Sequence, residues 1–177
     1  MTIVVGLHVR RGDFLDKVNA DWGYAVATPQ YFTRATSWFV NKYGEDILFL
    51  VASDDVAWAK ENIDFSGAKH EFSTSNAPHE DFITMIGCDH HIISVGSFGW
   101  WTAFLSGGDV VYYLDFPTPL SRHSENHKHY DYYPSQWIGL RWSAKRNCFK
   151  LRNANAQFYD RATKVIGHFQ YHQSTIL

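Results

Sequence analysis

The sequence has few cysteines, few charges and no long apolar segment. Its 177 residues include only two cysteines, Cys88 and Cys148, which are too few for the disulfide framework of a small secreted domain and form no zinc-binding pattern. The longest apolar runs, such as residues 47–52, are far shorter than the roughly 20 residues that cross a bilayer. We therefore expect neither a membrane span nor a signal peptide within these residues.

The net charge of the chain is also small. Sixteen Lys and Arg residues against eighteen Asp and Glu residues give a net charge of -2 at pH 7. A chain without an overall positive field is not expected to bind nucleic acid, so any binding of phosphate groups must be local. The hydrophobic share of 45% and the aromatic share of 17% exclude a disordered chain, collagen and a coiled coil.

What the sequence does contain is an alternation of apolar strands with helices. After a predicted strand at 2–9, Thr28 and Pro29 supply the N-cap and the first residue of a helix that Gly44 ends. The alternation predicts an α/β fold, a Rossmann-like parallel sheet with flanking helices on both faces. Further strands are predicted at 47–52, 70–72, 91–95 and 109–114, and further helices at 56–59, 78–86 and 100–105.

The predicted strands are apolar without alternation, as expected for a sheet that is covered on both faces. We divide the chain into a Rossmann-like domain, residues 1–140, and a C-terminal extension, residues 141–177, whose only clear pattern is a helix at 156–169. The predicted core is built from Val4, Val5, Leu48, Leu50, Ile92, Ile93, Val110 and Val111.

Three polar turns follow predicted strands, at residues 10–13, 53–55 and 96–99. In a doubly wound sheet, ligands bind beyond the carboxyl ends of the strands, where these turns are expected to lie. Arg10 in the first turn offers a planar fork that suits phosphate oxygens. Ser97 in the third turn begins a helix, whose free backbone N–H groups attract an anion. Together the turns predict a diphosphate site without a Walker loop and without a metal ion.

Taken singly, the same residues also have ordinary structural explanations. An arginine pair after a strand is usually solvated, and Ser97 is a common helix cap. Trp100 and Trp101 suit a hydrophobic core as well as a stacking platform. The histidines of one irregular stretch, His123, His127 and His129, are interpreted as part of a solvated loop rather than a metal site, because no zinc-binding pattern is complete.

The order of the motifs adds a resemblance. Residues 8–13 (HVRRGD) resemble the first motif of the α-1,2-fucosyltransferases and of the related α-1,6- and protein O-fucosyltransferases. Residues 89–108 (DHHIISVGSFGWWTAFLSGG) resemble the second motif of the galactoside α-1,2-fucosyltransferases, and residues 132–137 (YYPSQW) are similar to a third segment. The resemblance covers about residues 3–140 and implies the C-terminal, donor-binding half of a GT-B glycosyltransferase.

The resemblance implies roles for individual residues. Arg10 would bind the β-phosphate of GDP, supported by Arg11, and Ser97 would lie beside the diphosphate. Asp81 stands sixteen positions before Ser97, at the place where related enzymes read guanine with a carboxylate. The predicted substrate-binding residues are His8, Arg10, Arg11, Ser53, Asp54, Asp81, Ser97, Phe98 and Gly99, and the predicted catalytic residues are Arg10 and Asp13.

The implied activity is an inverting transfer of L-fucose from GDP-L-fucose to the 2-hydroxyl of a terminal galactose. The partners are then GDP-L-fucose and a galactose-terminated glycan, with no metal cofactor, and the general base is sought among Asp13, Asp16 and Asp21. The family also implies the Golgi membrane, with an anchor encoded upstream. Two alternatives stay open: a catalytically silent GDP-fucose-binding fragment, and an interaction domain that recognises glycans or proteins through its aromatic surface.

Overall fold

The computed structural model describes residues 2–44, 46–75, 77–143 and 148–152, and in them a single seven-stranded sheet. The strand order is β3-β2-β1-β4-β5-β6-β7, with all neighbours parallel except the antiparallel pair β6 and β7. The strands are β1 (Ile3–Val9), β2 (Ile47–Ser53), β3 (Lys69–Phe72), β4 (His90–Ile93), β5 (Val110–Tyr113), β6 (Ile138–Ser143) and β7 (Cys148–Arg152).

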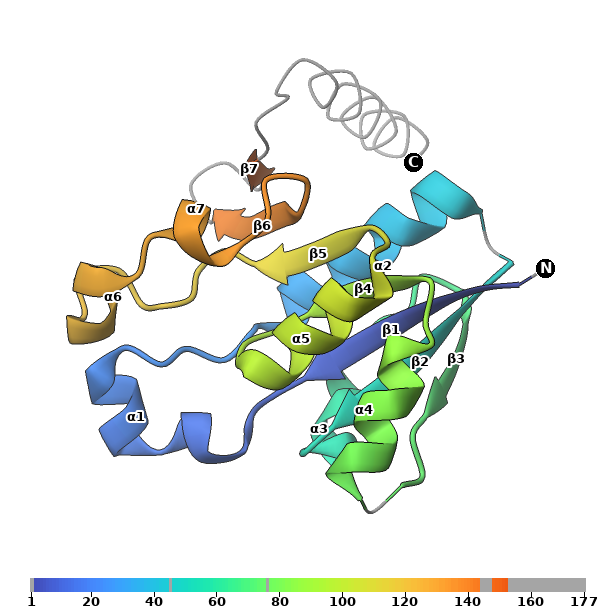
Figure 1. Cartoon of the computed structure of the whole chain (residues 1–177), viewed down its shortest axis with the longest axis horizontal. Helices are drawn as coiled ribbons and strands as arrows, with labels where there is room; N and C mark the ends of the chain where they lie inside the picture. Colours follow the sequence, from blue (N-terminus) through green and yellow to red (C-terminus); the bar gives the residue numbers. More distant parts are fainter. Residues whose placement is uncertain (1, 45, 76, 144–147, 153–177) are drawn as a thin grey trace, which may run out of the picture.

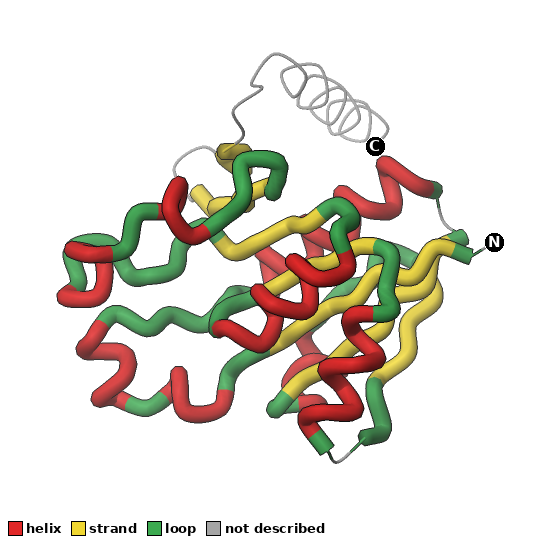
Figure 2. Tube along the Cα trace, viewed as in Figure 1, coloured by secondary structure: helices red, strands yellow, loops and turns green. Residues whose placement is uncertain are grey.

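Helices cover both faces of this sheet, which confirms the predicted Rossmann-like α/β fold. Helices α2 and α3 lie on one face, and α4 and α5 on the other (Figure 1). The tube in Figure 2 shows the strands as one layer between these helices. The helices are η1 (Gly12–Leu15), α1 (Lys17–Trp22), α2 (Pro29–Tyr43), α3 (Val56–Asn62), α4 (Pro78–Ile86), α5 (Ser97–Ser106), α6 (Arg122–Asn126) and α7 (His129–Tyr132).

Helix α2 provides most of the core on its side of the sheet. It begins as predicted: the Thr28 hydroxyl accepts a hydrogen bond from the Tyr31 N–H (3.3 Å), Pro29 is the first helical residue, and Gly44 ends the helix at φ 86°. Tyr31 is fully buried, and its hydroxyl donates to the carbonyl oxygens of Ile93 (2.7 Å) and of β5. This bond ties the helix to the centre of the sheet.

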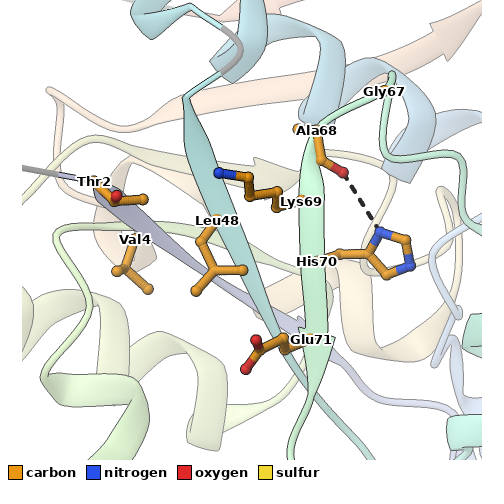
Figure 3. Close-up of a pocket in the computed structure, with 8 residues that line it drawn as sticks. All are labelled: Thr2, Val4, Leu48, Gly67, Ala68, Lys69, His70 and Glu71. Atoms are coloured by element: carbon orange, nitrogen blue, oxygen red, sulfur yellow. Dashed lines mark hydrogen bonds between the residues drawn. The ribbon is translucent and has the colours of Figure 1, made fainter.

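The predicted core is correct for five of its eight residues. Val4, Leu48 and Leu50 are only partly buried, because they point to the α4–α5 face and this part of the face is incompletely covered. Their neighbours in the strands, Val5 and Phe49, point to the α2 face and are fully buried. The apolar strands are thus covered unequally on their two faces. A hollow lined by Thr2, Val4, Leu48, Gly67, Ala68, Lys69, His70 and Glu71 lies there (Figure 3).

An outer layer, defined here as residues 12–24 and 115–133, lies beyond the carboxyl ends of the strands (Figure 1). Its two segments meet through aromatic rings: Phe116 is 6.3 Å from Phe14 and 6.0 Å from Tyr24, measured between ring centroids. The interpretation of the histidine stretch as a solvated loop is wrong for His127, which is 8% exposed and lies 3.9 Å from the Tyr132 ring. The stretch instead forms a packed aromatic cluster.

Two sequence-based expectations concern the end of the chain. The division at residue 140 stays a prediction, and β6 continues beyond that position to Ser143. The predicted helix at 156–169 lies outside the described residues. Strand β7 was not expected from the sequence, since residues 148–152 show no clear period.

Candidate functional site

The candidate site lies where the order of the strands reverses. The chain passes from β1 to β2 on one side and later returns to place β4 on the other side of β1. In open parallel sheets, ligands bind at such a switch point, outside the carboxyl ends of the strands. Here the two segments that follow β1 and β4 are residues 10–13 and 94–97. The hollow of Figure 3 lies at the opposite end of the sheet, beside the first residues of β1 and β2.

Arg10 is the first residue after β1, and its environment fixes both its backbone and its side chain. The Arg10 N–H donates to the Ser94 hydroxyl (2.8 Å), which joins the β1 loop to the end of β4. Its guanidinium pairs through Nη1 with Asp54 (2.7 Å) and through Nη2 with Asp13. The side chain retains 36% exposure, so the guanidinium is held at the surface of the site.

Arg11 is held more tightly than Arg10, with a side chain only 14% exposed. Its Nε donates to Asp55 (3.0 Å), and its guanidinium lies 3.8 Å from the centre of the Trp58 ring. The pairing with Arg11 and the bond from the Trp58 N–H lower the pKa of the Asp55 carboxyl. Arg11 therefore fastens the β1 loop to the start of α3.

His8 lies beneath the start of α5. It is 6% exposed, and its ring stacks on Phe98 at a centroid distance of 5.1 Å. Burial, with Arg10 and His91 nearby, lowers the pKa of His8 to about 3, so the ring is neutral at physiological pH. A Cβ atom at Gly99 would lie 2.5 Å from His8 Nδ1, so only glycine allows the helix to approach this closely.

The start of α5 has the geometry expected of an anion site. Gly96 precedes the helix with a φ of 89°, and Ser97, its first residue, is exposed. No side chain caps the first turn among the described residues, so its backbone N–H groups have no side-chain acceptor there. The interpretation of Ser97 as a helix cap therefore does not apply, because Gly96 takes the cap position.

Asp81 and Ser53 are the remaining predicted binding residues, and they lie in α4 and at the end of β2. Asp81 is in α4, and its carboxylate accepts a hydrogen bond from the Ser73 hydroxyl. The next residue, Phe82, contacts Phe98 with a centroid distance of 5.4 Å, which places α4 beside the start of α5. Ser53 ends β2, and its hydroxyl accepts from the Asp55 N–H (2.9 Å). Ser53 thus shapes the turn through this bond, in which its hydroxyl acts as an acceptor.

The three candidate bases differ in position. Asp13 reaches Arg10, whereas Asp21 pairs with Lys17 (2.8 Å) on the exposed outer side of α1. Asp16 is exposed and occupies the N-cap position of α1 without a side-chain cap bond. Of the three carboxylates, Asp13 is therefore the one that the structure brings to the arginine at the switch point.

Sequence reasoning missed four residues that build this site: Ser94, Asp55, Trp58 and Phe14. Ser94 is hidden in an apolar strand, and its bond to Arg10 spans 84 positions, so no local signal marks it. Phe14 lies beneath Arg10, with 5.6 Å between the guanidinium carbon and the ring centre. The predicted polar turn at 53–55 included Asp55, but not its pairing with Arg11.

Three further observations concern metal ions, thiols and membrane spans. Within residues 2–44, 46–75, 77–143 and 148–152, no group of three or more His, Cys, Asp or Glu side chains is placed to hold a metal ion. Cys88 is free and buried, and burial raises its pKa to about 11, which disfavours a reactive thiolate. None of the helices in this described part is both long and apolar enough to pass through a bilayer.

Comparisons with known proteins agree with the motif resemblance. The sequence profile of glycosyl transferase family 11 matches residues 2–141. The chain is similar to galactoside alpha-(1,2)-fucosyltransferase 1 of Sus scrofa (35% identical) and of Homo sapiens (36% identical), in each case over 139 residues. These matches cover 77% of this chain but only 38% of each relative. No solved structure matches the chain. On the family match and these identities, the chain belongs to glycosyl transferase family 11.

Proposed function

We propose that this chain is the donor-binding part of an inverting galactoside α-1,2-fucosyltransferase, with GDP-L-fucose as donor and a galactose-terminated glycan as acceptor. The observation that carries the proposal is the convergence of Arg10 and the start of α5 at the switch point between β1 and β4. A fixed guanidinium on one side and free helix N–H groups on the other form a cradle for a diphosphate.

The proposed reaction breaks the bond between C1 of fucose and a β-phosphate oxygen of GDP. The 2-hydroxyl oxygen of galactose attacks C1 from the opposite face, its proton passes to a carboxylate base, and GDP leaves. Negative charge builds up on the β-phosphate during this step. Arg10 and the N–H groups at Ser97 and Phe98 would stabilise that charge, which is the kind of contribution that dominates many enzyme rates. No step of this scheme requires a metal ion.

The proposed recognition of guanine rests on Asp81. Its carboxylate would accept from the N1–H and the 2-amino group of guanine, as the family resemblance implies. The ring contact between Phe82 and Phe98 supports this assignment, since it keeps α4 beside the diphosphate end of the site. In the free protein the Ser73 hydroxyl donates to the same carboxylate.

The acceptor side of the proposal is less complete within this chain. Asp13 is the proposed general base, because it is the candidate carboxylate nearest the proposed position of the β-phosphate. The GT-B arrangement implies that a second Rossmann-like half shapes the rest of the acceptor site, and the chain spans 38% of the length of its relatives. Residence in the Golgi membrane is proposed on the family resemblance alone.

A second candidate function is a catalytically silent module that binds GDP-fucose without transferring it. Titration calorimetry with GDP and GDP-fucose separates both candidates from an interaction domain that binds neither. A transfer assay with a β-galactoside acceptor then separates the enzyme from the silent module.

Arg10 is the residue on which to test the donor site. Arg10→Ala and Arg10→Lys should both weaken GDP binding, because lysine keeps the charge but loses the fork. If the chain is active, transfer should fall by about 10²–10³-fold. Arg122→Ala is the matched control, because Arg122 is exposed on α6 beside Trp22. If Arg10→Ala bound GDP as tightly as the parent, with an unchanged circular dichroism spectrum, the donor-site assignment would be wrong.

A further inference from the structure

The guanidinium of Arg10 is already occupied in the free protein. Nη1 donates to Asp54 and Nη2 donates to Asp13, while the neighbouring Arg11 pairs with Asp55. Two guanidinium groups therefore face three carboxylates at the end of β1. An incoming diphosphate meets no excess of positive charge at this point unless one of the carboxylates leaves.

Carboxylate and phosphate oxygens compete for the same N–H donors of a guanidinium, because both groups offer pairs of anionic oxygens that accept charge-assisted hydrogen bonds. A phosphate can thus reach Arg10 in two ways, by displacing Asp13 or by displacing Asp54. The surroundings of the two carboxylates decide between these alternatives.

Asp54 is the fixed partner. It directly follows β2, its side chain is 26% exposed, and its second oxygen accepts from the Arg11 N–H (2.9 Å). The β1 loop closes tightly over it: a Cβ atom at Gly12 would lie 2.5 Å from Asp54 Oδ2. Moving this carboxylate would break two hydrogen bonds and open the loop between β1 and β2.

Asp13 is the movable partner. Its side chain is 54% exposed, and it belongs to η1, a single turn of four residues without a buried member among those described. One oxygen of its carboxylate pairs with Arg10. Exposed ion pairs of this kind contribute little free energy, so displacement of Asp13 has a small cost.

We propose that Asp13 is a built-in stand-in for the donor phosphate: it occupies Arg10 in the free protein and is displaced by the β-phosphate, while Asp54 stays and holds the guanidinium in place. This inference rests on the proposed function of the site and adds its regulation. Asp54 is then a positioning residue rather than a contact of the donor. The displaced Asp13 carboxylate becomes available to accept the proton of the acceptor hydroxyl.

The proposal predicts opposite effects for two isosteric substitutions on the same arginine. Asp13→Asn removes a competing charge and should raise the affinity for GDP and for inorganic pyrophosphate by about 2–5-fold. Asp54→Asn removes the charged partner that orients Arg10 and should lower both affinities by about tenfold. Guanosine, which has no phosphate, should bind both variants as it binds the parent.

The experiment is titration calorimetry on the full chain with GDP, pyrophosphate and guanosine, with circular dichroism as a check of the fold. Asp21→Asn is the matched control, because it removes an exposed carboxylate of the same layer that pairs with Lys17 instead of Arg10. This control should leave all three affinities unchanged, which separates displacement at Arg10 from a change in net charge.

Each outcome has a distinct meaning. If Asp54→Asn raised GDP affinity as Asp13→Asn does, both aspartates would be simple competitors and the positioning role would be refuted. If Asp13→Asn left GDP affinity unchanged or lowered it, the stand-in role would be refuted. A loss of guanosine binding in Asp54→Asn would indicate a damaged site instead of a misplaced arginine, and would also count against the inference. A parent protein that binds none of the three ligands would refute the proposed function itself.

Discussion

The sheet with its helices α2–α5, called here the body, and the outer layer are held together in different ways. The body buries large apolar side chains completely, among them Phe39, Phe49 and Leu7. The helices of the outer layer, η1, α1, α6 and α7, have four to six residues each and no buried member among the described residues. The candidate site lies between the two regions, with Arg10 fixed by the body and Asp13 carried by the layer. The contacts that fix Arg10 thus come from the body, whereas the carboxylate that is proposed to move, that of Asp13, belongs to the outer layer.

The largest effect on stability is expected when an aromatic ring is removed from the core of the body. Phe39→Ala should lower the free energy of unfolding by about 3–5 kcal/mol, because it deletes a fully buried ring and leaves a cavity. Leu120→Ala, at a fully exposed position of the outer layer, should change it by less than about 0.5 kcal/mol. Urea unfolding followed by circular dichroism measures both. Equal effects of the two substitutions would remove the basis of the comparison.

An intermediate effect is expected from pH, and it should appear in the outer layer. His127 is buried, and neither ring nitrogen has a hydrogen-bond partner in the described part of the chain. The titratable groups around its ring are His123, His129 and the phenols of Tyr132 and Tyr133. Burial, together with the two histidines, lowers the pKa of His127 from 6.5 to about 4.

The unfolded layer therefore binds a proton more readily than the folded layer. The contribution of the neutral His127 ring to the stability of the layer is fully present above pH 6.5. This contribution falls as the pH drops from 6.5 toward about 4. At pH 5 the loss is about 2 kcal/mol, or about a 30-fold rise in the opening equilibrium of residues 115–133. Hydrogen exchange, corrected for intrinsic rates, measures this rise. His127→Phe should abolish it, and an identical pH dependence in that variant would assign the effect to other groups.

The smallest effects are expected from two helix caps, one in each region. The Thr28 hydroxyl caps α2, and the Ser121 hydroxyl caps the five-residue α6 by accepting from the Ser124 N–H (3.2 Å). Thr28→Ala should lower the global free energy of unfolding by about 1 kcal/mol. Ser121→Ala should speed hydrogen exchange only within the outer layer and leave the global value unchanged. A global loss of equal size in both variants would mean that the layer unfolds together with the body.

The body was predictable from the sequence, because its signals are local. Thr28, Pro29 and Gly44 mark the ends of α2 by their own backbone chemistry, and the apolar strands stand out from their surroundings. The error at Leu48 and Leu50 has a physical cause: an apolar run shows that both faces of a strand tolerate burial, but the packing of distant helices decides how much of each face is covered.

The outer layer and the charge balance of the site were not predictable in the same way. The burial of His127 depends on Tyr132 and Phe116, and no periodic pattern of residues connects these positions. The motif at 8–13 identified Arg10, but its partner Asp54 is 44 residues away. A motif states which residue types are present, whereas the partner of each charge depends on how the sheet brings distant turns together.

The position of β1 between β2 and β4 has a consequence for the order of folding. Its neighbour β4 begins 81 residues after β1 ends, and the bond between the Arg10 N–H and Ser94 exists only once these two strands have paired. Closing so long a loop is entropically costly and slow, so we expect the pairing of β1 with β4 to form late in folding. An intermediate in which only β1, α2 and β2 have formed holds Arg10 but has no partner for a diphosphate. A nucleotide added during refolding should therefore leave the rate of the early folding steps unchanged. It should act only by slowing the unfolding of the completed sheet.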